Sequence, residues 1–471
     1  MTLFKKSVKT FSWSFLGSGL GFVFQLLIAR ILGASEFGKA NVILGFVGTY
    51  YTLLNFGLPT LLIRESAKNK NNSINLFSNF FYLYFILDII FLPVIYFTLR
   101  YSLRNIGLWN IFNIVIILLM IFLTQTANLL YAYFIGIKKQ NYTSFLRDTL
   151  TRLIRIFSFF LIYIFISNYI SYILAALISF FVPLFIALFR IKKIKNIKIK
   201  WILINSWQFY LISITYTLYN SLSKILQKLY ATNETVGYLS VGITLGSIGV
   251  ILGSSLASVS MPEFAHAWKE KNMKKIDLIF KEVSRWNAYV MLPIVIFLLL
   301  NVKRILEFLG KDYANGTIIV SIILISQFLN SFVGPNGTLL NMSGYQRFEI
   351  YNGIAMIITG TTIGILLGPK FSWGIAVSLA IATIIVNLLK FIEVGIIHKI
   401  YPYNIKTFVY IILEGFYSFI LFLLFKKINQ TILWFLLNSI LILVTIIFTF
   451  RFSPNIEDRN IIKKFINKIL R

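Results

Sequence analysis

The sequence predicts an all-α protein that crosses a membrane many times. Of its 471 residues, 58% are hydrophobic and only 13% are charged, whereas soluble proteins carry about 25% charged residues. The mean hydropathy is +0.80. Apolar runs of about 20 residues, long enough to cross a bilayer core of about 30 Å, recur along the whole chain. The short polar segments between them leave no room for a sizeable folded domain outside the membrane.

The apolar runs predict about 14 transmembrane helices. The first run follows Lys5, Lys6 and Lys9, as in a signal peptide, but it is too long for one and leads directly into a second run. We therefore expect it to remain as the first transmembrane helix. The expected spans are 11–32, 39–62, 77–99, 108–136, 149–167, 170–190, 202–230, 237–261, 286–302, 316–342, 350–368, 373–398, 407–425 and 431–450.

The distribution of Lys and Arg predicts the orientation of the chain. With the N-terminus in the cytoplasm, roughly 30 of these residues fall in cytoplasmic loops and roughly 9 in the opposite loops. The net charge of +29 then reflects membrane topology rather than nucleic-acid binding. Two basic segments, 264–286 and the tail after residue 451, have amphipathic patterns, and we expect both to lie on an anionic inner leaflet.

An internal repeat organises the predicted spans. The turn GASEFG at Gly33–Gly38 has a counterpart in ATNETVG at Ala231–Gly237, and Gly136 aligns with Gly344. The offset is about 200 residues, and an even number of spans per copy keeps both copies in the same orientation. This predicts two six-helix lobes related by a parallel pseudo-two-fold axis, followed by two extra helices and an amphipathic cytoplasmic tail. The expected boundaries are 1–195, 196–400 and 401–471.

Several basic side chains lie inside predicted spans, where a charge costs about 2.5–3.5 kcal/mol unless it faces a wet cavity or a partner. Arg30 and Lys228 occupy nearly equivalent positions of the two copies, and Lys224 shares a helix face with Lys228. We expect these three cations to line one cavity between the lobes. The alternative is that Arg30 and Lys228 extend to the headgroups. Further candidates for this cationic cavity are Gln25, Arg152, Arg155 and Lys390.

Three acids inside the spans are candidate ion-coupling groups: Asp88, Glu393 and Glu414. Asp88 and Glu414 could instead be buried partners of a cavity cation. Lys390 and Glu393, at i and i+3, could simply neutralise each other. The two candidate arginines of the fifth span could be interface charges at a helix start.

The sequence holds no recognisable catalytic or metal-binding motif. It has no cysteine, and its two histidines, His266 and His398, are far apart. We therefore expect no enzyme activity, no metal site and no cofactor. GASEFGKA at Gly33–Ala40 lacks the final hydroxyl residue and the preceding strand of a phosphate-binding loop. Glycine pairs such as Gly17 and Gly21 are typical of close helix contacts.

Two segments carry a family resemblance. ARILGASEFGKANVILGFVG at Ala29–Gly48 and NFGLPTLLIRESAK at Asn55–Lys68 resemble the N-terminal region of bacterial polysaccharide flippases. These are the O-antigen and capsule repeat-unit translocases of the multidrug/oligosaccharidyl-lipid/polysaccharide exporter superfamily. NMSGYQRFEIYNGI and FSWGIAVSLA extend the resemblance into the second half. Only Arg30 of the turn motif is carried over as a functional residue. The two extra helices resemble those of lipid II flippases and longer polysaccharide flippases.

The resemblance implies a V-shaped pair of lobes around a cationic cavity, and transport by alternating access. We expect a flippase that moves undecaprenyl-pyrophosphate-linked oligosaccharide repeat units from the cytoplasmic to the outer leaflet of the bacterial inner membrane, coupled to H+ or Na+. Both termini would be cytoplasmic. The expected partners are this lipid-linked substrate, membrane lipids, and polysaccharide polymerase and chain-length proteins. The alternatives are a lipid II flippase and a multidrug/cation antiporter, which would favour an acidic cavity. An enzyme such as a polymerase would need a larger outer loop than this chain offers.

Overall fold

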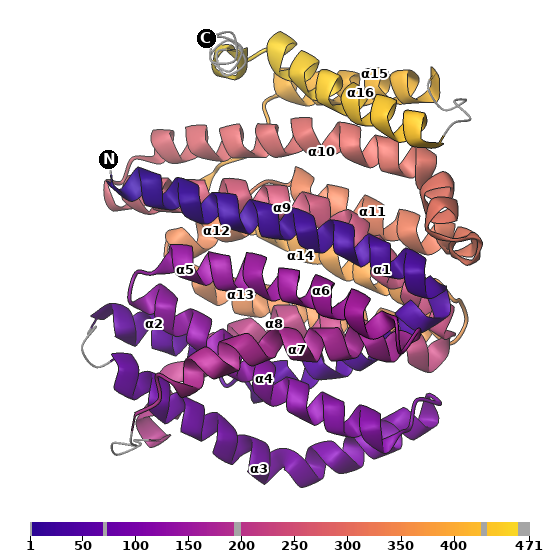
Figure 1. The fold of residues 1–471 in the computed structure, drawn as a ribbon. Helices are drawn as coiled ribbons and strands as arrows, with labels where there is room; N and C mark the ends of the chain where they lie inside the picture. The colour runs from indigo at the N-terminus through magenta and orange to yellow at the C-terminus, as the bar shows by residue number, and fades with distance from the viewer. Residues whose placement is uncertain (1, 69–72, 193–198, 425–430, 460–471) are drawn as a thin grey trace. The chain divides into compact units, whose positions relative to one another are not determined.

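The computed structural model describes residues 2–68, 73–192, 199–424 and 431–459. Within these ranges the chain is helical and contains no strand (Figure 1). Nine of the described helices are long and apolar enough to span a membrane. The chain is therefore an all-α integral membrane protein, as predicted. The predicted amphipathic tail falls largely beyond residue 459, outside the described residues.

The helices group into two compact units. The first comprises Met1–Thr244, Leu309–Gly316 and Met356–Leu379, and the second comprises Leu245–Phe308, Thr317–Ala355 and Ala380–Arg471. The elements before residue 244 are α1 (Thr2–Leu54), α2 (Leu58–Lys68), α3 (Ser73–Asn105), α4 (Ile111–Gly136), α5 (Gln140–Ser144), the π-helix η2 (Phe145–Leu150), α6 (Thr151–Tyr163), α7 (Tyr169–Leu188), α8 (Ile199–Tyr230) and the start of α9 (Asn233–Lys269).

The remaining elements follow in chain order, and α9, α13, α14 and, by its last residue, α10 contribute to both units. They are α10 (Met273–Leu309), the 3-10 helix η3 (Lys311–Gly316), α11 (Thr317–Phe332), α12 (Asn336–Met342), α13 (Gln346–Leu367), α14 (Gly374–His398), α15 (Ile405–Leu424) and α16 (Thr431–Phe452). Each predicted span overlaps at least one of these helices. The predicted lobe boundaries near residues 195 and 400 stay a prediction.

The long helix α1 contains the first predicted span, 11–32, and the part of the second, 39–62, up to Leu54, where α1 ends before α2 begins at Leu58. Gly33 has φ 75° and ψ 170°, whereas the helix continues on both sides of it. Glycine adopts a positive φ readily because it has no Cβ. The turn predicted over Gly33–Gly38 is therefore a one-residue break, after which the helix resumes at Ala34.

The two copies of the predicted repeat touch one another within the first unit, next to this break. Gly38 lies against Asn233, and Gly237 lies against Ala34, so closely that a Cβ at either glycine would overlap the facing carbonyl oxygen. The repeat that aligns Gly38 with Gly237 also aligns Ala34 with Asn233. The contact is thus reciprocal, as contacts across a two-fold axis are. Both copies have glycine here because a side chain would separate the backbones.

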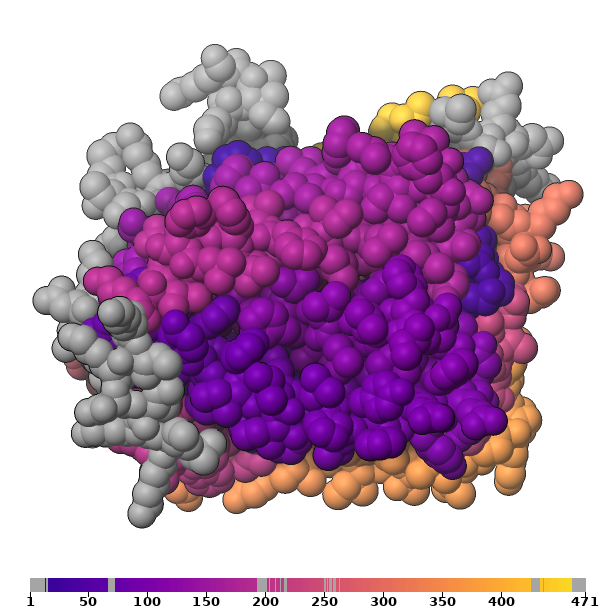
Figure 2. All heavy atoms as spheres, turned by 60° about the horizontal axis from the view of Figure 1, so that its bottom comes forward, coloured from indigo at the N-terminus to yellow at the C-terminus, as the bar shows by residue number. Residues whose placement is uncertain are grey.

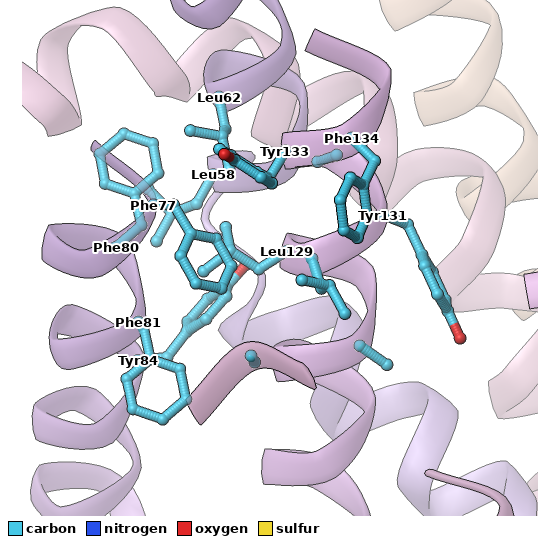
Figure 3. Close-up of a cluster of buried hydrophobic side chains, with 14 of the residues drawn as sticks. Leu58, Leu62, Phe77, Phe80, Phe81, Tyr84, Leu129, Tyr131, Tyr133 and Phe134 are labelled. Atoms are coloured by element: carbon cyan, nitrogen blue, oxygen red, sulfur yellow. The ribbon is translucent and has the colours of Figure 1, made fainter. Parts of the chain in front are cut away.

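An aromatic cluster forms the core between α2, α3 and α4 of the first unit. On α3 the buried face, with Phe77 and Tyr84, turns toward α4, while Phe85 and Ile90 on the opposite face are exposed. An exposed apolar face of this kind suits contact with hydrocarbon. Figure 2 shows the side chains of this N-terminal part of the chain, indigo to magenta, packed against one another on one face. Figure 3 shows the core cluster itself, which includes Leu58, Leu62, Phe77, Phe80, Phe81, Tyr84, Leu129, Tyr131, Tyr133 and Phe134.

The segment 264–286 differs from the prediction that it lies on the membrane surface. A short turn joins the end of α9 to the start of α10 within this segment. Ile276 and Phe280 of α10 are fully buried in one cluster with Leu339 and Val394. The expected apolar face is present, but protein covers it rather than lipid. An amphipathic pattern reports an apolar face without reporting what covers that face.

Two helix ends in the second unit also differ from the prediction. The expected span 316–342 is divided into α11 and α12 near Gly334, which has φ 85°. The start of α13, at Gln346, lies four residues before the expected span 350–368. This difference matters for the site because it places Glu349 on a helix.

The segment that follows α16 is bound to α10 by a buried ion pair. The Asp458 carboxylate is fully buried and accepts hydrogen bonds from Arg285 Nε at 3.2 Å and Nη2 at 3.1 Å. Trp286 Nε1 and the Ser453 hydroxyl also donate to Asp458, at 2.9 and 2.7 Å. Four donors therefore satisfy one carboxylate and fix the end of α16 against α10.

Candidate substrate-binding site

A lysine on α8 forms a defined polar contact inside the first unit. Lys224 Nζ donates to Asn41 Oδ1 of α1 at 2.8 Å. Asn41 is buried, and its Nδ2 donates to the Phe37 carbonyl at 2.9 Å, which orients the amide oxygen toward the lysine. The helices approach closely here because α1 has Gly45 opposite the lysine. A Cβ at Gly45 would lie 3.1 Å from the Ser221 carbonyl oxygen.

The charge of Lys224 has no acidic counter-ion among the described residues. Asn41 is neutral, so it solvates the ammonium group without cancelling its charge, and it takes only one of the three N–H donors. Lys224 lies about 9 Å along the helix axis before the end of α8, at 1.5 Å per residue. A cation at this depth in an apolar helix is the kind of residue that marks a substrate path.

Lys228 lies one turn further along α8, at the end where the two repeat copies touch. It is partly exposed, and it is within electrostatic range of Glu234, which attracts it, and of Lys39, which repels it. Glu234 lies before the apolar part of α9. Hydrogen bonds from Thr232 and Ser35, together with the charge of Lys228, lower the pKa of the Glu234 carboxyl below its usual value. Glu234 is therefore ionised at neutral pH and offsets part of the charge of Lys228.

Arg30 lies just before the break at Gly33, on the exposed side of α1. Its neighbour Ala29 is fully buried, and the Ala29 carbonyl accepts a hydrogen bond from the Tyr313 hydroxyl at 3.0 Å. The backbone that carries Arg30 is thus held to η3, and Arg30 itself is exposed.

Three of the other predicted site residues lie between α1, α6 and α7. The Tyr172 hydroxyl donates to Gln25 Oε1 at 3.2 Å, and Arg155 Nη2 donates to the Ser179 hydroxyl at 3.2 Å. The Arg152 guanidinium packs on Gly21 of α1, where a Cβ would be 3.1 Å from it. This group is therefore built by helices α6 and α7, whereas Lys224 lies between α1 and α8.

Lys390 is paired in the second unit, but not with the acid that the i, i+3 spacing suggested. Lys390 Nζ lies 3.0 Å from Glu349 Oε2, and the two side chains are only 13% and 8% exposed. Glu393 instead accepts a hydrogen bond from Asn352 Nδ2 at 2.7 Å. The direct ion pair of Lys390 is therefore with Glu349 and not with Glu393, because α13 and α14 form a hairpin that brings Glu349 opposite the lysine.

The two remaining acids have neutral partners. Asp88 Oδ1 accepts from Gln125 Nε2 at 3.2 Å. Glu414 is fully buried, and its Oε1 accepts from the Thr449 hydroxyl at 3.0 Å. Neither acid pairs with a cation among the described residues, so the alternative that they are counter-ions of cavity cations is not what the structure shows.

The sequence does not directly reveal the partners of Lys224, Asp88, Lys390, Glu393 and Glu414. For four of these five site residues, the available signal is position in a helical hairpin, since the partner lies across a short connection from the site residue. Asn41 gives no such signal, because a long stretch of chain separates α1 from α8. The missed residues are Asn41, Gln125, Glu349, Asn352 and Thr449.

A separate cavity of about 380 Å³ lies in the second unit. Its walls are mostly aromatic and aliphatic, and none of the predicted site residues lines it. The described residues contain no group of three or more metal-binding side chains. The lining residues of the cavity are Phe332, Val333, Phe391, Tyr401, Pro402, Tyr403, Asn404, Ile405 and Phe408.

Solved structures share this fold. "Lipid II flippase MurJ, inward closed conformation" superposes with a TM-score of 0.76 at 14% identity, covering 98% of this chain and 99% of that chain. An inward-facing multidrug resistance MATE family transporter of the MOP superfamily gives a TM-score of 0.66 at 14% identity, over 81% of this chain and 94% of that chain. A MOP superfamily transporter from Pyrococcus furiosus, described as having a binding pocket of reverse polarity, gives a TM-score of 0.56 at 14% identity, over 84% of this chain and 96% of that chain.

The chain thus has the fold of these membrane transporters, as the resemblance implied. No curated protein matches the chain. The model of one protein family, described as "Polysaccharide biosynthesis protein", matches residues 3–268, which is more than half of the chain. This region includes the turn motif, Asn41 and Lys224. The chain therefore belongs to the polysaccharide biosynthesis protein family.

Proposed function

We propose that this protein is a flippase that moves undecaprenyl-pyrophosphate-linked oligosaccharide repeat units from the cytoplasmic to the outer leaflet of the bacterial inner membrane. The observation that carries the proposal is Lys224, a cation within an apolar helix that is bound by the neutral Asn41 and has no acidic partner among the described residues. An uncompensated cation within the membrane favours an anionic substrate. Membership of the polysaccharide biosynthesis family supports a glycan as the rest of that substrate.

The physical problem is the polar headgroup of such a lipid. Pyrophosphate and sugar hydroxyls lose their hydration in hydrocarbon unless protein groups replace it, whereas the polyprenyl tail can stay in the lipid. Lys224 would attract the pyrophosphate as a point charge, and Arg30 would add bidentate hydrogen bonds. Alternating access would then expose the headgroup to one side of the membrane at a time. We propose coupling to an ion gradient, cytoplasmic termini, and polymerase and chain-length proteins as partners.

A lipid II flippase is the second candidate function. It is favoured by the superposition with the MurJ structure, which covers 98% of this chain and so includes helices α15 and α16. Both candidate substrates carry a polyprenyl pyrophosphate, so Lys224 and Arg30 would serve either. The lipid-linked sugar that accumulates when the gene is deleted distinguishes the two functions.

A multidrug/cation antiporter is the third candidate. The MATE transporter structures cover a smaller share of this chain, 81% for the inward-facing one. A site for cationic drugs needs acids, whereas the site between α1 and α8 presents a lysine bound by an amide. Export of cationic dyes by cells that express the protein, with no change in surface glycan, would support this candidate instead.

The proposed function is tested by complementing a deletion strain with lysine variants. Lys224→Met keeps the aliphatic stem and removes the charge, and we expect surface glycan to fall roughly 10- to 100-fold, since hydrogen bonds to charged groups contribute about 1.5–3 kcal/mol. Lys224→Arg should retain part of the activity. Arg30→Ala should abolish surface glycan while the protein still inserts into the membrane.

The matched control is Lys370→Met, which removes an exposed lysine outside the site. This variant should export glycan at the wild-type level, with equal amounts of each protein in the membrane. Wild-type export by both Lys224→Met and Arg30→Ala would contradict the proposed site.

A further inference from the structure

The acid of α3 lies in the middle of a helix that separates the aromatic core from the lipid-facing surface. Asp88 is one turn beyond Tyr84, which belongs to the core cluster (Figure 3). Its neighbours Phe85, Ile89 and Ile90 are 50%, 54% and 61% exposed, so they form the outer face of α3. The carboxyl therefore lies at the edge of the α3–α4 contact, surrounded by apolar side chains.

The pair formed by Asp88 and Gln125 is incomplete in its hydrogen bonding. Gln125 Nε2 donates to Asp88 Oδ1 at 3.2 Å, and this is a single bond between two planar groups. Asp88 Oδ2 and Gln125 Oε1 are both buried and have no hydrogen-bond partner among the described residues. Both of these atoms are acceptors when the carboxyl is ionised, so they cannot bond to each other. A proton on Asp88 Oδ2 lets this atom donate a hydrogen bond to Gln125 Oε1, and this one bond gives both atoms a partner.

We propose that Asp88 and Gln125 form a proton-binding site, in which Asp88 Oδ2 takes up one proton and donates it as a hydrogen bond to Gln125 Oε1. Gln125 Nε2 continues to donate to Asp88 Oδ1, so the protonated carboxyl and the amide form a closed pair with two hydrogen bonds. The ionised pair has only one. The Asp88 carboxyl and the Gln125 amide therefore bind the proton together.

Among the described residues, no charged side chain bonds to Asp88 from the helices that pack against α3, and the group that contacts its carboxyl is the Gln125 amide. From α3 itself the titratable neighbour is Tyr84, and beyond it lies Tyr51 of α1. Both are neutral at physiological pH. On α2, the side chains of Arg64 and Glu65 bond to each other at 2.8 Å. The described residues place no cation on the ionised form of Asp88, so proton uptake is the means by which this carboxyl becomes fully bonded.

Proton binding would strengthen the contact between α3 and α4. Loss of the proton leaves a buried charge and an amide oxygen without a donor, and this state is relieved only if water enters between the helices. A ligand shifts a conformational equilibrium when it binds one state better than the other. This step rests on the proposed function: a proton at Asp88 would be the coupling ion that drives the transport cycle.

The site is tested first by infrared difference spectroscopy of the purified full-length protein in lipid vesicles, with acidification as the only change. Wild type should gain a carbonyl band of a protonated carboxyl that Asp88→Asn lacks and that Gln125→Leu shifts. The matched control is Glu414→Gln, which removes another buried acid bonded to a neutral hydroxyl. It should keep the Asp88 band, and Asp88→Glu should give a displaced one. A spectrum in which Asp88→Asn loses no band, or Gln125→Leu shifts none, would overturn the proposal.

Coupling is tested in vesicles that contain the lipid-linked oligosaccharide. A transmembrane pH gradient should accelerate translocation by the wild type, and this acceleration should be lost in Asp88→Asn. An unchanged wild-type rate with and without the gradient would overturn the coupling role, although translocation itself would still support the flippase function. If the wild type moves no glycan with or without the gradient, the flippase function fails, and the infrared comparison still decides whether the proton site exists.

Discussion

At Asp458, four hydrogen-bond donors converge on one carboxylate that no solvent reaches. Removal of one partner from a buried ion pair costs about 3–5 kcal/mol, because the other charge stays buried without compensation. We therefore expect Asp458→Asn to lower the free energy of unfolding by about that amount. The measurement is thermal denaturation of the purified protein in detergent.

The neighbouring residue provides the control for this prediction. Glu457 lies 4.0 Å from Arg285, and its side chain is 69% exposed. Exposed ion pairs contribute about 0–1 kcal/mol, so Glu457→Gln should leave the melting temperature almost unchanged. Equal effects of the two substitutions would show that the buried pair does not hold the end of α16.

Single residues also show how far the sequence can predict a site. Lys224 and Asp88 are predictable, since a charge inside an apolar run is unusual wherever it occurs. Gln125 and Glu349 are predictable in principle, because each lies about as far from a hairpin connection as its partner does. The two pairs between α13 and α14 have the same spacing: Glu349–Lys390 and Asn352–Glu393 are each separated by 41 residues.

Asn41 is not predictable in this way. It lies 183 residues before Lys224, and only the packing of α1 against α8 brings the two together. No local spacing rule applies over that distance, and a buried asparagine in an apolar helix resembles many others in the chain.

At the scale of helices, the part of α1 next to its break packs directly against the start of α9. Gly38 and Gly237 each face a main-chain carbonyl at a distance that excludes a Cβ. We expect Gly38→Ala and Gly237→Ala to destabilise the protein by similar amounts, about 1–3 kcal/mol, because the helices must separate to accommodate the methyl group. Differential scanning calorimetry measures the loss of stability in both variants.

Gly19→Ala is the control for these two substitutions. Gly19 lies in α1 with no atom within 4 Å of its Cβ position. Alanine in a helix is more stable than glycine by about 0.5–1 kcal/mol, so Gly19→Ala should be neutral or slightly stabilising. A stabilising effect of Gly38→Ala would contradict the close reciprocal contact.

Helix positions follow from the sequence more reliably than helix ends and helix partners. Hydropathy predicts α3, α4 and α14 because their apolar runs are long and continuous. It does not predict the separation of α11 from α12 near Gly334, which depends on a local positive φ. It also assigns 264–286 to the lipid surface, because the residues that cover Ile276 and Phe280 lie far away in the chain.

At the scale of the whole molecule, the fold depends more on the pattern of apolar and charged residues than on which amino acid stands at each position. The MurJ structure shares only 14% of residues with this chain and still superposes over 98% of it. Span lengths, loop charges and the repeat are enough to specify such a fold, which is why the sequence alone predicts its class. Because the fold depends so little on the identity of individual residues, recognising the fold does not identify one substrate among related lipid-linked sugars.

The central claim is that the uncompensated charge between α1 and α8 binds an anionic lipid-linked glycan. Asn41→Asp tests it most directly, because the new carboxylate would pair with Lys224 and cancel that charge while the lysine stays in place. The measurement is the rate at which purified protein in vesicles moves an undecaprenyl-pyrophosphate-linked oligosaccharide between leaflets. The control is Asn301→Asp, at a buried asparagine that also donates to a carbonyl one turn earlier.

We predict that Asn41→Asp lowers this rate roughly tenfold or more, since a charge-assisted contact with the pyrophosphate is lost, while its melting temperature is no lower than that of the wild type. Asn301→Asp should translocate at the wild-type rate. Translocation by Asn41→Asp at the wild-type rate would contradict the account, because the site would then work without its positive charge.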